Sequence, residues 1–212
     1  LRAAVLGAND GLISTSSIIV GVAAAAVTRE PIVLAGIAGM VAGALSMAAG
    51  EYVSVSSQAD SELADLERER EELATTPDLE HAELTNIYVG RGLTPELASQ
   101  VAEQLAAHDA LAAHARDELG IFELTRARPL QAALASAAAF GTGALPAVVL
   151  ASLVPLSAVS TMVGGSSLVL LALLGAVSAR LGGAPLLAGT LRVTFWGAVA
   201  MASTALVGRL FG

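Results

Sequence analysis

Hydrophobic and polar positions divide the chain into five long apolar stretches, with one acidic insert between the second and the third. The apolar stretches cover residues 3–27, 32–55, 130–154, 156–179 and 193–211. Each is long enough to cross the ~30 Å hydrocarbon core of a bilayer as an α-helix. The pattern therefore predicts an all-α integral membrane protein with five transmembrane helices and the lipid bilayer as its surroundings.

The second apolar stretch runs into the insert without a break. Neither glycine nor proline occurs between Glu51 and Thr76, so nothing ends the helix that begins near Ile32. A helix from there to Ala74 would be roughly 65 Å long at ~1.5 Å per residue. Only its first part is apolar, and we therefore expect a membrane helix that continues into water as a stalk.

Two further helices are expected in the insert, because Thr-Pro pairs mark helix starts at Thr76 and Thr94 and glycines mark the ends at Gly90 and Gly120. The predicted division has three parts. They are residues 1–57 (first two spans), 58–125 (acidic three-helix insert with the stalk) and 126–212 (last three spans).

Acidic residues are placed symmetrically about the turn at Thr76. Glu72 and Glu80 each lie four residues from it, and Glu69 and Glu83 each lie seven. Residues equidistant from the turn of an antiparallel helix hairpin tend to face each other, so four carboxylates should converge. Converging carboxylates are costly unless a cation binds among them. The alternative is a solvated acidic helix with arginines interleaved; the symmetric spacing favours metal.

The third helix of the insert places His114 and Glu118 one turn apart on one face. A histidine and a carboxylate at this spacing form a common surface pair as well as half of a metal site. The spacing alone favours neither.

One carboxylate falls inside an apolar stretch. Asp10 lies in the first span, where a charged residue costs of order 2.5–3.5 kcal/mol and usually faces a partner or a water-filled path. Met47 lies at a similar depth in the second span, with Glu51 one turn later. We expect Asp10, Met47 and Glu51 to share a cavity open to the cytoplasm. The alternatives are core packing for Met47 and a wet interfacial position for Glu51.

Composition excludes several kinds of function. The chain is 55% hydrophobic with a mean hydropathy of +0.70, and 16 of its 19 acidic residues lie between Asp60 and Glu123. There is no cysteine, which excludes disulfides, thiolate metal sites and cysteine nucleophiles. A net charge of −8 without a basic patch argues against nucleic acid as a partner. No cleavable signal is evident, and we expect a short N-terminal piece before Leu1.

The basic residues are all arginine and predict the orientation. With the N-terminus in the cytoplasm, nine arginines fall on the cytoplasmic side and two on the other. The insert is then cytoplasmic and the C-terminus lies outside. The cytoplasmic set is Arg2, Arg68, Arg70, Arg91, Arg116, Arg126, Arg128, Arg180 and Arg192, and the other side has Arg29 and Arg209.

Glycines recur at helix-packing spacing, for example Gly39 and Gly43 in the second span. Such spacing permits close helix contact, either within a subunit or across a dimer, and we expect a homodimer packed through these glycine-rich helices.

With these features the chain resembles the vacuolar iron transporter family over nearly its whole length. The specific segments are Gly-Ala-Asn-Asp-Gly-Leu at 7–12, Gly-Ala-Leu-Ser-Met at 43–47, Gly-Glu-Tyr-Val-Ser at 50–54, and Asp-Glu-Leu-Gly at 117–120. The resemblance implies a homodimer of five-helix subunits that exchanges Fe²⁺, and often Mn²⁺, for protons. It also implies a cytoplasmic three-helix domain that collects metal.

The resemblance implies roles for particular residues. The metal glutamates of the domain correspond to Glu69, Glu72, Glu80, Glu83 and Glu118, and the transport carboxylate and thioether correspond to Asp10 and Met47. Two positions depart from the family pattern. The second membrane carboxylate of plant members is Gly39 here, and Glu51 is its candidate replacement. Family methionines before the last domain glutamate are His114 and Ala115 here, which makes the site less soft and admits Zn²⁺ beside Fe²⁺ and Mn²⁺.

The sequence thus predicts a divalent-metal/proton antiporter, not an enzyme, that exports cytoplasmic Fe²⁺ or Mn²⁺ across a bacterial inner membrane and needs no prosthetic group. One alternative is a membrane-bound di-iron carboxylate oxidase, which needs two Glu-x-x-His motifs; the nearest match is the single Asp78-x-x-His81. The other is a non-transporting membrane scaffold with an acidic docking domain, which leaves Asp10 without a role.

Overall fold

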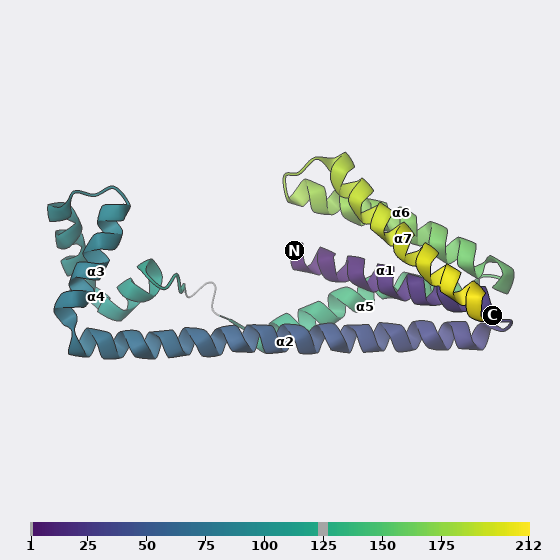
Figure 1. Ribbon diagram of the computed structural model, residues 1–212, viewed down its shortest axis with the longest axis horizontal. Coiled ribbons are helices and arrows are strands. Elements are labelled where there is room, and N and C mark those ends of the chain that lie inside the picture. The colour runs from purple at the N-terminus through teal and green to yellow at the C-terminus, as the bar shows by residue number, and fades with distance from the viewer. Residues whose placement is uncertain (1, 123–126) are drawn as a thin grey trace. The chain divides into compact units, whose positions relative to one another are not determined.

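The computed structural model describes residues 2–122 and 127–212, and this part of the chain is helical without strands (Figure 1). Five helices are long and apolar enough to cross a membrane. The prediction of an all-α membrane protein with five spans is confirmed. The expected boundary at 125 and 126, and with it Arg126, lies outside the described residues. The helices are α1 (Arg2–Ala25), α2 (Arg29–Thr75), α3 (Pro77–Gly90), α4 (Pro95–Asp117), α5 (Pro129–Leu153), α6 (Val159–Leu181) and α7 (Leu186–Phe211), with the 3₁₀-helix η2 (Leu156–Ala158) before α6.

The chain forms two compact units. A membrane unit comprises Leu1–Tyr52 and Leu130–Gly212, and an insert unit comprises Val53–Pro129. Helix α2 contributes its apolar first half to the membrane unit and its charged second half to the insert unit. It is one continuous helix of 47 residues, as expected from the absence of glycine and proline after Gly50.

Helix α1 is the most buried of the spans and packs against α6 and α7 (Figure 1). It also approaches α5 so closely that the backbones nearly touch. A Cβ added to Gly11 would lie 2.1 Å from the carbonyl oxygen of Phe140, and one added to Gly143 would lie 2.0 Å from that of Ala8. Only glycine permits this approach at the two positions.

The glycines of α2 are used inside the subunit. A Cβ at Gly43 would lie 2.1 Å from the Phe140 ring, and one at Gly39 would lie 2.7 Å from the end of Ile18. The spacing alone left open whether these glycines serve packing within a subunit or between subunits. Their close contacts are made by α5 and α1 of the same chain.

A charged clamp joins the start of α2 to the end of α5. The Arg29 guanidinium donates from Nη1 to the Ser152 carbonyl and from Nη2 to the Val154 carbonyl. The last carbonyls of a helix have no partner within the helix, and a cation there also interacts favourably with the helix dipole. Arg29 therefore caps α5.

The insert unit has a small core between α3 and α4, made by Leu84, Tyr88, Ala98, Ala102 and Ala113. The helix boundaries at 77, 90 and 95 agree with those predicted from the sequence.

The two threonines expected to cap these helices behave differently. The Thr94 hydroxyl accepts from the Leu97 backbone N–H at 3.4 Å and caps α4 as expected. The Thr76 hydroxyl instead donates to the Glu72 carbonyl at 3.1 Å and caps the end of α2.

The third helix of the insert is broken, contrary to the single helix expected. Asp109 has extended backbone angles (φ −161°, ψ 96°) within α4, and its Oδ1 accepts from the Ala112 N–H at 3.0 Å. Aspartate favours this position because its short side chain satisfies a free N–H at a helix start. A separate two-turn segment therefore begins after Asp109; it ends at Asp117, before the expected end at Gly120.

Candidate metal centre

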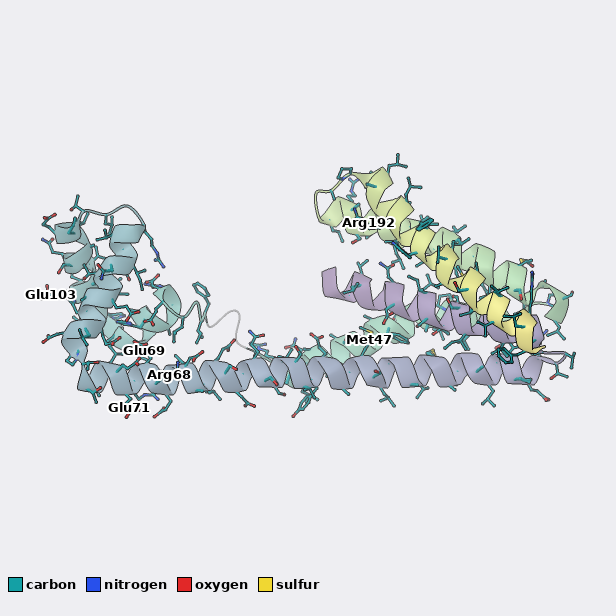
Figure 2. The ribbon with its side chains drawn as sticks, viewed as in Figure 1. Met47, Arg68, Glu69, Glu71, Glu103 and Arg192 are labelled. Atoms are coloured by element: carbon teal, nitrogen blue, oxygen red, sulfur yellow. The ribbon has the colours of Figure 1, made fainter. Side chains whose placement is uncertain are left out.

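Four side chains from three elements of the insert unit converge on one point. Glu69 comes from α2, Glu80 from α3, and His114 and Glu118 from the end of α4 and its C-cap. One ligand atom of each lies within 4.8 Å of the others. We call these four residues the metal cluster. Figure 2 shows Glu69 on the face of α2 that is turned toward α4, and Glu71 on the opposite face.

The imidazole of His114 is at the centre of the cluster. Its Nδ1 lies 2.9 Å from Glu69 Oε1, 2.9 Å from Glu118 Oε2 and 3.8 Å from Glu80 Oε2. His114 and Glu69 are 1% and 2% exposed, and Glu80 is also buried. Nδ1 can donate only one hydrogen bond, so it cannot fully satisfy both Glu118 Oε2 and Glu69 Oε1, and no other donor among the described residues reaches Glu69 Oε1. Buried carboxylate oxygens are rarely left short of donors, so the centre of the cluster is suited to a cation.

The electrostatics of the cluster favours neutralisation of the negative charge on its carboxylates. Burial, and after it the charge of Glu118, raises the pKa of Glu69 from 4.5 to about 7, against the opposing influence of His114. Three carboxylates around one imidazole leave negative charge uncompensated even when the imidazole is protonated. Carboxylate oxygens and an imidazole nitrogen are the usual ligands of Fe²⁺, Mn²⁺ and Zn²⁺. The arrangement can therefore bind one such ion.

Two predicted ligands lie outside the cluster. Glu72 is half-buried and Glu83 is exposed. Both are nevertheless close enough for their charges to matter, because Glu118 first, and Glu80 and Glu72 less strongly, raise the pKa of Glu83.

The expected facing pairs about the turn, Glu72 with Glu80 and Glu69 with Glu83, are not those of the structure. Glu69 meets Glu80 instead. The reason is the turn itself: α3 begins after the single residue Thr76 and rises steeply from the end of α2 instead of running back along it (Figure 1).

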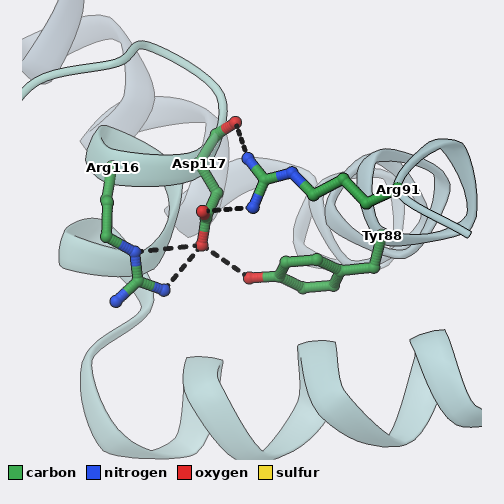
Figure 3. Close-up of polar contacts among 4 residues, drawn as sticks. All are labelled: Tyr88, Arg91, Arg116 and Asp117. Atoms are coloured by element: carbon green, nitrogen blue, oxygen red, sulfur yellow. Dashed lines mark hydrogen bonds and ion pairs between the residues drawn. The ribbon is translucent and has the colours of Figure 1, made fainter. Parts of the chain in front are cut away.

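A second polar network, which the sequence did not reveal, fixes the end of α4 (Figure 3). Asp117 Oδ2 accepts from the Tyr88 hydroxyl at 2.8 Å and from Arg116, and Oδ1 accepts from Arg91 at 2.6 Å. Burial alone would raise the pKa of Asp117, but the hydrogen bonds from Arg116, Arg91 and Tyr88 outweigh it and hold that pKa well below its usual range. The network ties α3 to the residue next to Glu118.

The expected transport residues lie in the membrane unit. Met47 is half-buried, and its methyl group would be 3.6 Å from a Cβ added to Gly7, one turn of α1 before Asp10. Asp10 and Glu51 are both exposed on the single subunit. The exposure of Asp10 puts a carboxylate on the surface of the membrane-spanning helix α1.

The histidine of the nearest di-iron-like motif is not part of the cluster. His81 Nε2 lies 3.1 Å from the Ser99 hydroxyl, at which distance the two side chains hydrogen-bond. His81 therefore joins α3 to α4 and is not one of the four residues of the cluster.

Comparison with known proteins then identifies the group to which this chain belongs. The model of the VIT family matches residues 1–209. The chain belongs to the VIT family. It is 48% identical over 211 residues to the "Vacuolar iron transporter" of Acanthamoeba castellanii, covering 99% of this chain and 78% of that protein. It is 36% identical over 215 residues to the "Vacuolar iron transporter homolog 2" of Arabidopsis thaliana, covering 100% of this chain and 84% of that protein.

Membership of the VIT family confirms the resemblance drawn from the sequence segments and places this chain among transporters, not enzymes. The di-iron oxidase alternative is thereby set aside.

The raised pKa of Glu69 predicts how the stability of this VIT-family chain depends on pH. A carboxyl whose pKa is raised in the folded state stabilises the fold below its unfolded pKa and loses that contribution as pH rises. In metal-free protein the α3–α4 segment should therefore lose stability as pH increases from 4.5 through about 7. Hydrogen exchange of this segment, compared at each pH with Glu69→Gln, measures it. A constant difference between the two proteins across this range would contradict the prediction.

Proposed function

We propose that this VIT-family chain is a divalent-metal/proton antiporter that moves Fe²⁺, and also Mn²⁺, out of the cytoplasm. The observation that supports it most is the metal cluster, in which three carboxylates, with Glu69 buried, surround one imidazole that cannot satisfy all of them. The names of its relatives support iron as cargo.

The proposed mechanism follows from charge. The metal cluster captures the ion, and the neighbouring Glu72 and Glu83 raise the local cation concentration at its approach. In the membrane unit Asp10 and Met47 take up the ion, the carboxylate supplying charge and the thioether a soft ligand. Protonation of Asp10 on the other side releases the ion, and the proton keeps Asp10 neutral on the return step.

The proposed direction rests on the arginine distribution, which favours an insert unit in the cytoplasm and a C-terminus outside. A metal-collecting domain on that side supplies ions for export. The membrane that we propose is the inner membrane of a bacterial cell.

Metal flux into proteoliposomes tests this function. Full-length protein reconstituted with its insert unit outward should accumulate Fe²⁺ or Mn²⁺ inside acidic vesicles, and dissipating the pH gradient should stop the accumulation. The competing proposal, a membrane scaffold that only docks a partner, predicts no flux under either condition. Metal flux that does not depend on the pH gradient would contradict proton exchange but would still support metal transport.

We further propose a homodimer, because Asp10 is exposed on α1 inside a span and lipid is a costly neighbour for a carboxylate. Leu6, 68% exposed one turn before Asp10, should then lie in the interface. Native mass spectrometry in detergent should find a dimer, and Leu6→Trp should shift it to monomer. The control Leu187→Trp, on α7 at 71% exposure, should not. Monomer at every concentration for the unmodified chain would contradict a dimer.

A further inference from the structure

We propose that His114 sets the metal selectivity of the cluster: it favours Fe²⁺ and Zn²⁺ over Mn²⁺ and excludes Mg²⁺ and Ca²⁺. This inference rests on the proposed metal binding at the cluster and names the class of ion that binds there. The inference concerns the imidazole of His114. Without it, the three carboxylates would form an all-oxygen site, which suits hard cations.

The position of the ring supports a ligand role. Nδ1 points at the common centre of three carboxylates, at 2.9 Å from Glu69, 2.9 Å from Glu118 and 3.8 Å from Glu80. The break at Asp109 starts the two-turn segment that holds His114 at this centre with its ring 1% exposed. A histidine on the water-facing side of α4 could not reach all three.

A purely structural ion pair does not account for this arrangement. A protonated imidazole has one positive charge, whereas the three carboxylates have up to three negative charges. Its Nδ1 can donate a single hydrogen bond, yet it lies 2.9 Å from both Glu69 Oε1 and Glu118 Oε2, so one proton cannot fully satisfy both buried oxygens. A divalent ion at the centre would contact all four ligand atoms at once and supply the missing charge.

The size and dryness of the cluster decide which ions fit. The four ligand atoms lie within 4.8 Å of one another, which leaves space for one ion. Glu69, Glu80 and His114 are buried, so few waters can complete a coordination shell. Ca²⁺ takes six to eight oxygen ligands and Mg²⁺ keeps several waters in an octahedron, whereas Zn²⁺ accepts four mixed N and O ligands.

The nitrogen ligand adds a preference among transition metals. Affinity for sites of this kind rises from Mn²⁺ through Fe²⁺, with Zn²⁺ above both, and imidazole suits Fe²⁺ and Zn²⁺ while all-oxygen sites suit Mn²⁺ and Mg²⁺. Replacing the imidazole by an oxygen donor should therefore weaken Fe²⁺ and Zn²⁺ more than Mn²⁺.

Equilibrium dialysis of full-length protein in detergent, stripped of metal and kept anaerobic, tests the proposal. Fe²⁺, Zn²⁺ and Mn²⁺ are each titrated with and without millimolar Mg²⁺. In the unmodified chain Fe²⁺ and Zn²⁺ should bind more tightly than Mn²⁺, with no effect of Mg²⁺. His114→Gln should reduce the Fe²⁺/Mn²⁺ affinity ratio by about tenfold or more, the usual range for altered metal surroundings, and admit Mg²⁺ competition.

Two further variants make the result specific. His108→Gln changes an exposed histidine of the same helix and should leave the ratio unchanged. His114→Met offers a softer donor in a similar volume and should widen the Fe²⁺/Mn²⁺ ratio, so the oxygen and sulfur donors are expected to act in opposite directions. If His114→Gln does not fold, His114→Met alone decides, and an unchanged ratio overturns the proposal.

The experiment also separates failure of this inference from failure of the proposed function. Glu80→Gln, measured beside the histidine variants, should weaken binding of every ion. If it does so while both His114 variants keep the normal ratio, the cluster binds metal and only the selectivity role is wrong. If Glu80→Gln has no effect on binding, the cluster is not the metal site.

Discussion

Replacing Asp10 with asparagine should abolish metal transport by the reconstituted protein and leave metal binding by the cluster unchanged. The amide keeps the size of the side chain but can neither attract a cation by charge nor take up a proton. Asp10 is exposed within a membrane-spanning helix, a position that a charged residue occupies at a cost and therefore seldom without a function. Proteoliposome uptake of Fe²⁺ or Mn²⁺ under a pH gradient measures transport, and dialysis of the same protein measures binding.

Ser14→Ala is the matched control for this substitution. Ser14 lies one turn from Asp10 and its hydroxyl donates only to backbone carbonyls, at 2.7 Å to that of Asp10. Its removal should leave transport near normal. Met47→Leu should reduce transport less than Asp10→Asn, since it removes one soft ligand and keeps the packing volume. Wild-type transport by Asp10→Asn would show the mechanism to be wrong and would make Glu51 the carboxylate to test next.

The double substitution Glu69→Gln and Glu80→Gln should remove tight metal binding, with a loss of more than ~100-fold in affinity, because two of four ligands lose their charge. Transport at low metal concentration should fall with it, since the insert unit no longer collects the ion. The metal-free fold should not be harmed, because the change removes two buried carboxylates that repel Glu118.

The control for this double substitution is a second pair of glutamates, which have the same charge but lie outside the cluster. Glu71→Gln with Glu103→Gln alters two exposed residues of the insert unit, both labelled in Figure 2 and neither in the cluster. The net charge changes by the same amount, so any general electrostatic effect is matched. Equal metal binding by the two double variants would show that the cluster does not hold metal and that only overall charge attracts it.

Much of the fold could be predicted because local signals decide it. The continuous α2 follows from the absence of helix breakers, and the start of α4 follows from Thr94 before a proline. The apolar spans were found with ends within a few residues, except that α7 begins at Leu186, earlier than the expected 193, because Arg192 does not interrupt a helix.

The geometry of the metal cluster depends on tertiary contacts that spacing along the chain does not encode. Symmetry about Thr76 predicted that Glu69 would face Glu83 and Glu72 would face Glu80, whereas the structure brings Glu69 to Glu80, because the prediction assumed an antiparallel hairpin. The burial of His114 depends on the break at Asp109. The local signal for this break is weak, because it consists of one aspartate that accepts from the backbone N–H three residues later. The bonds from Tyr88 and Arg91 to Asp117 span 29 and 26 residues, beyond any helical periodicity.

The Arg29 clamp has a consequence for how the membrane unit can move. Two charge-assisted hydrogen bonds fasten the first turn of α2 to the last carbonyls of α5, and both would have to break before the helices could slide past each other. Sliding is thus disfavoured, while rotation about this end keeps both bonds. We expect alternating access to proceed by rotation about this end, so that α5 and the part of α2 that belongs to the membrane unit separate most at the ends far from Arg29.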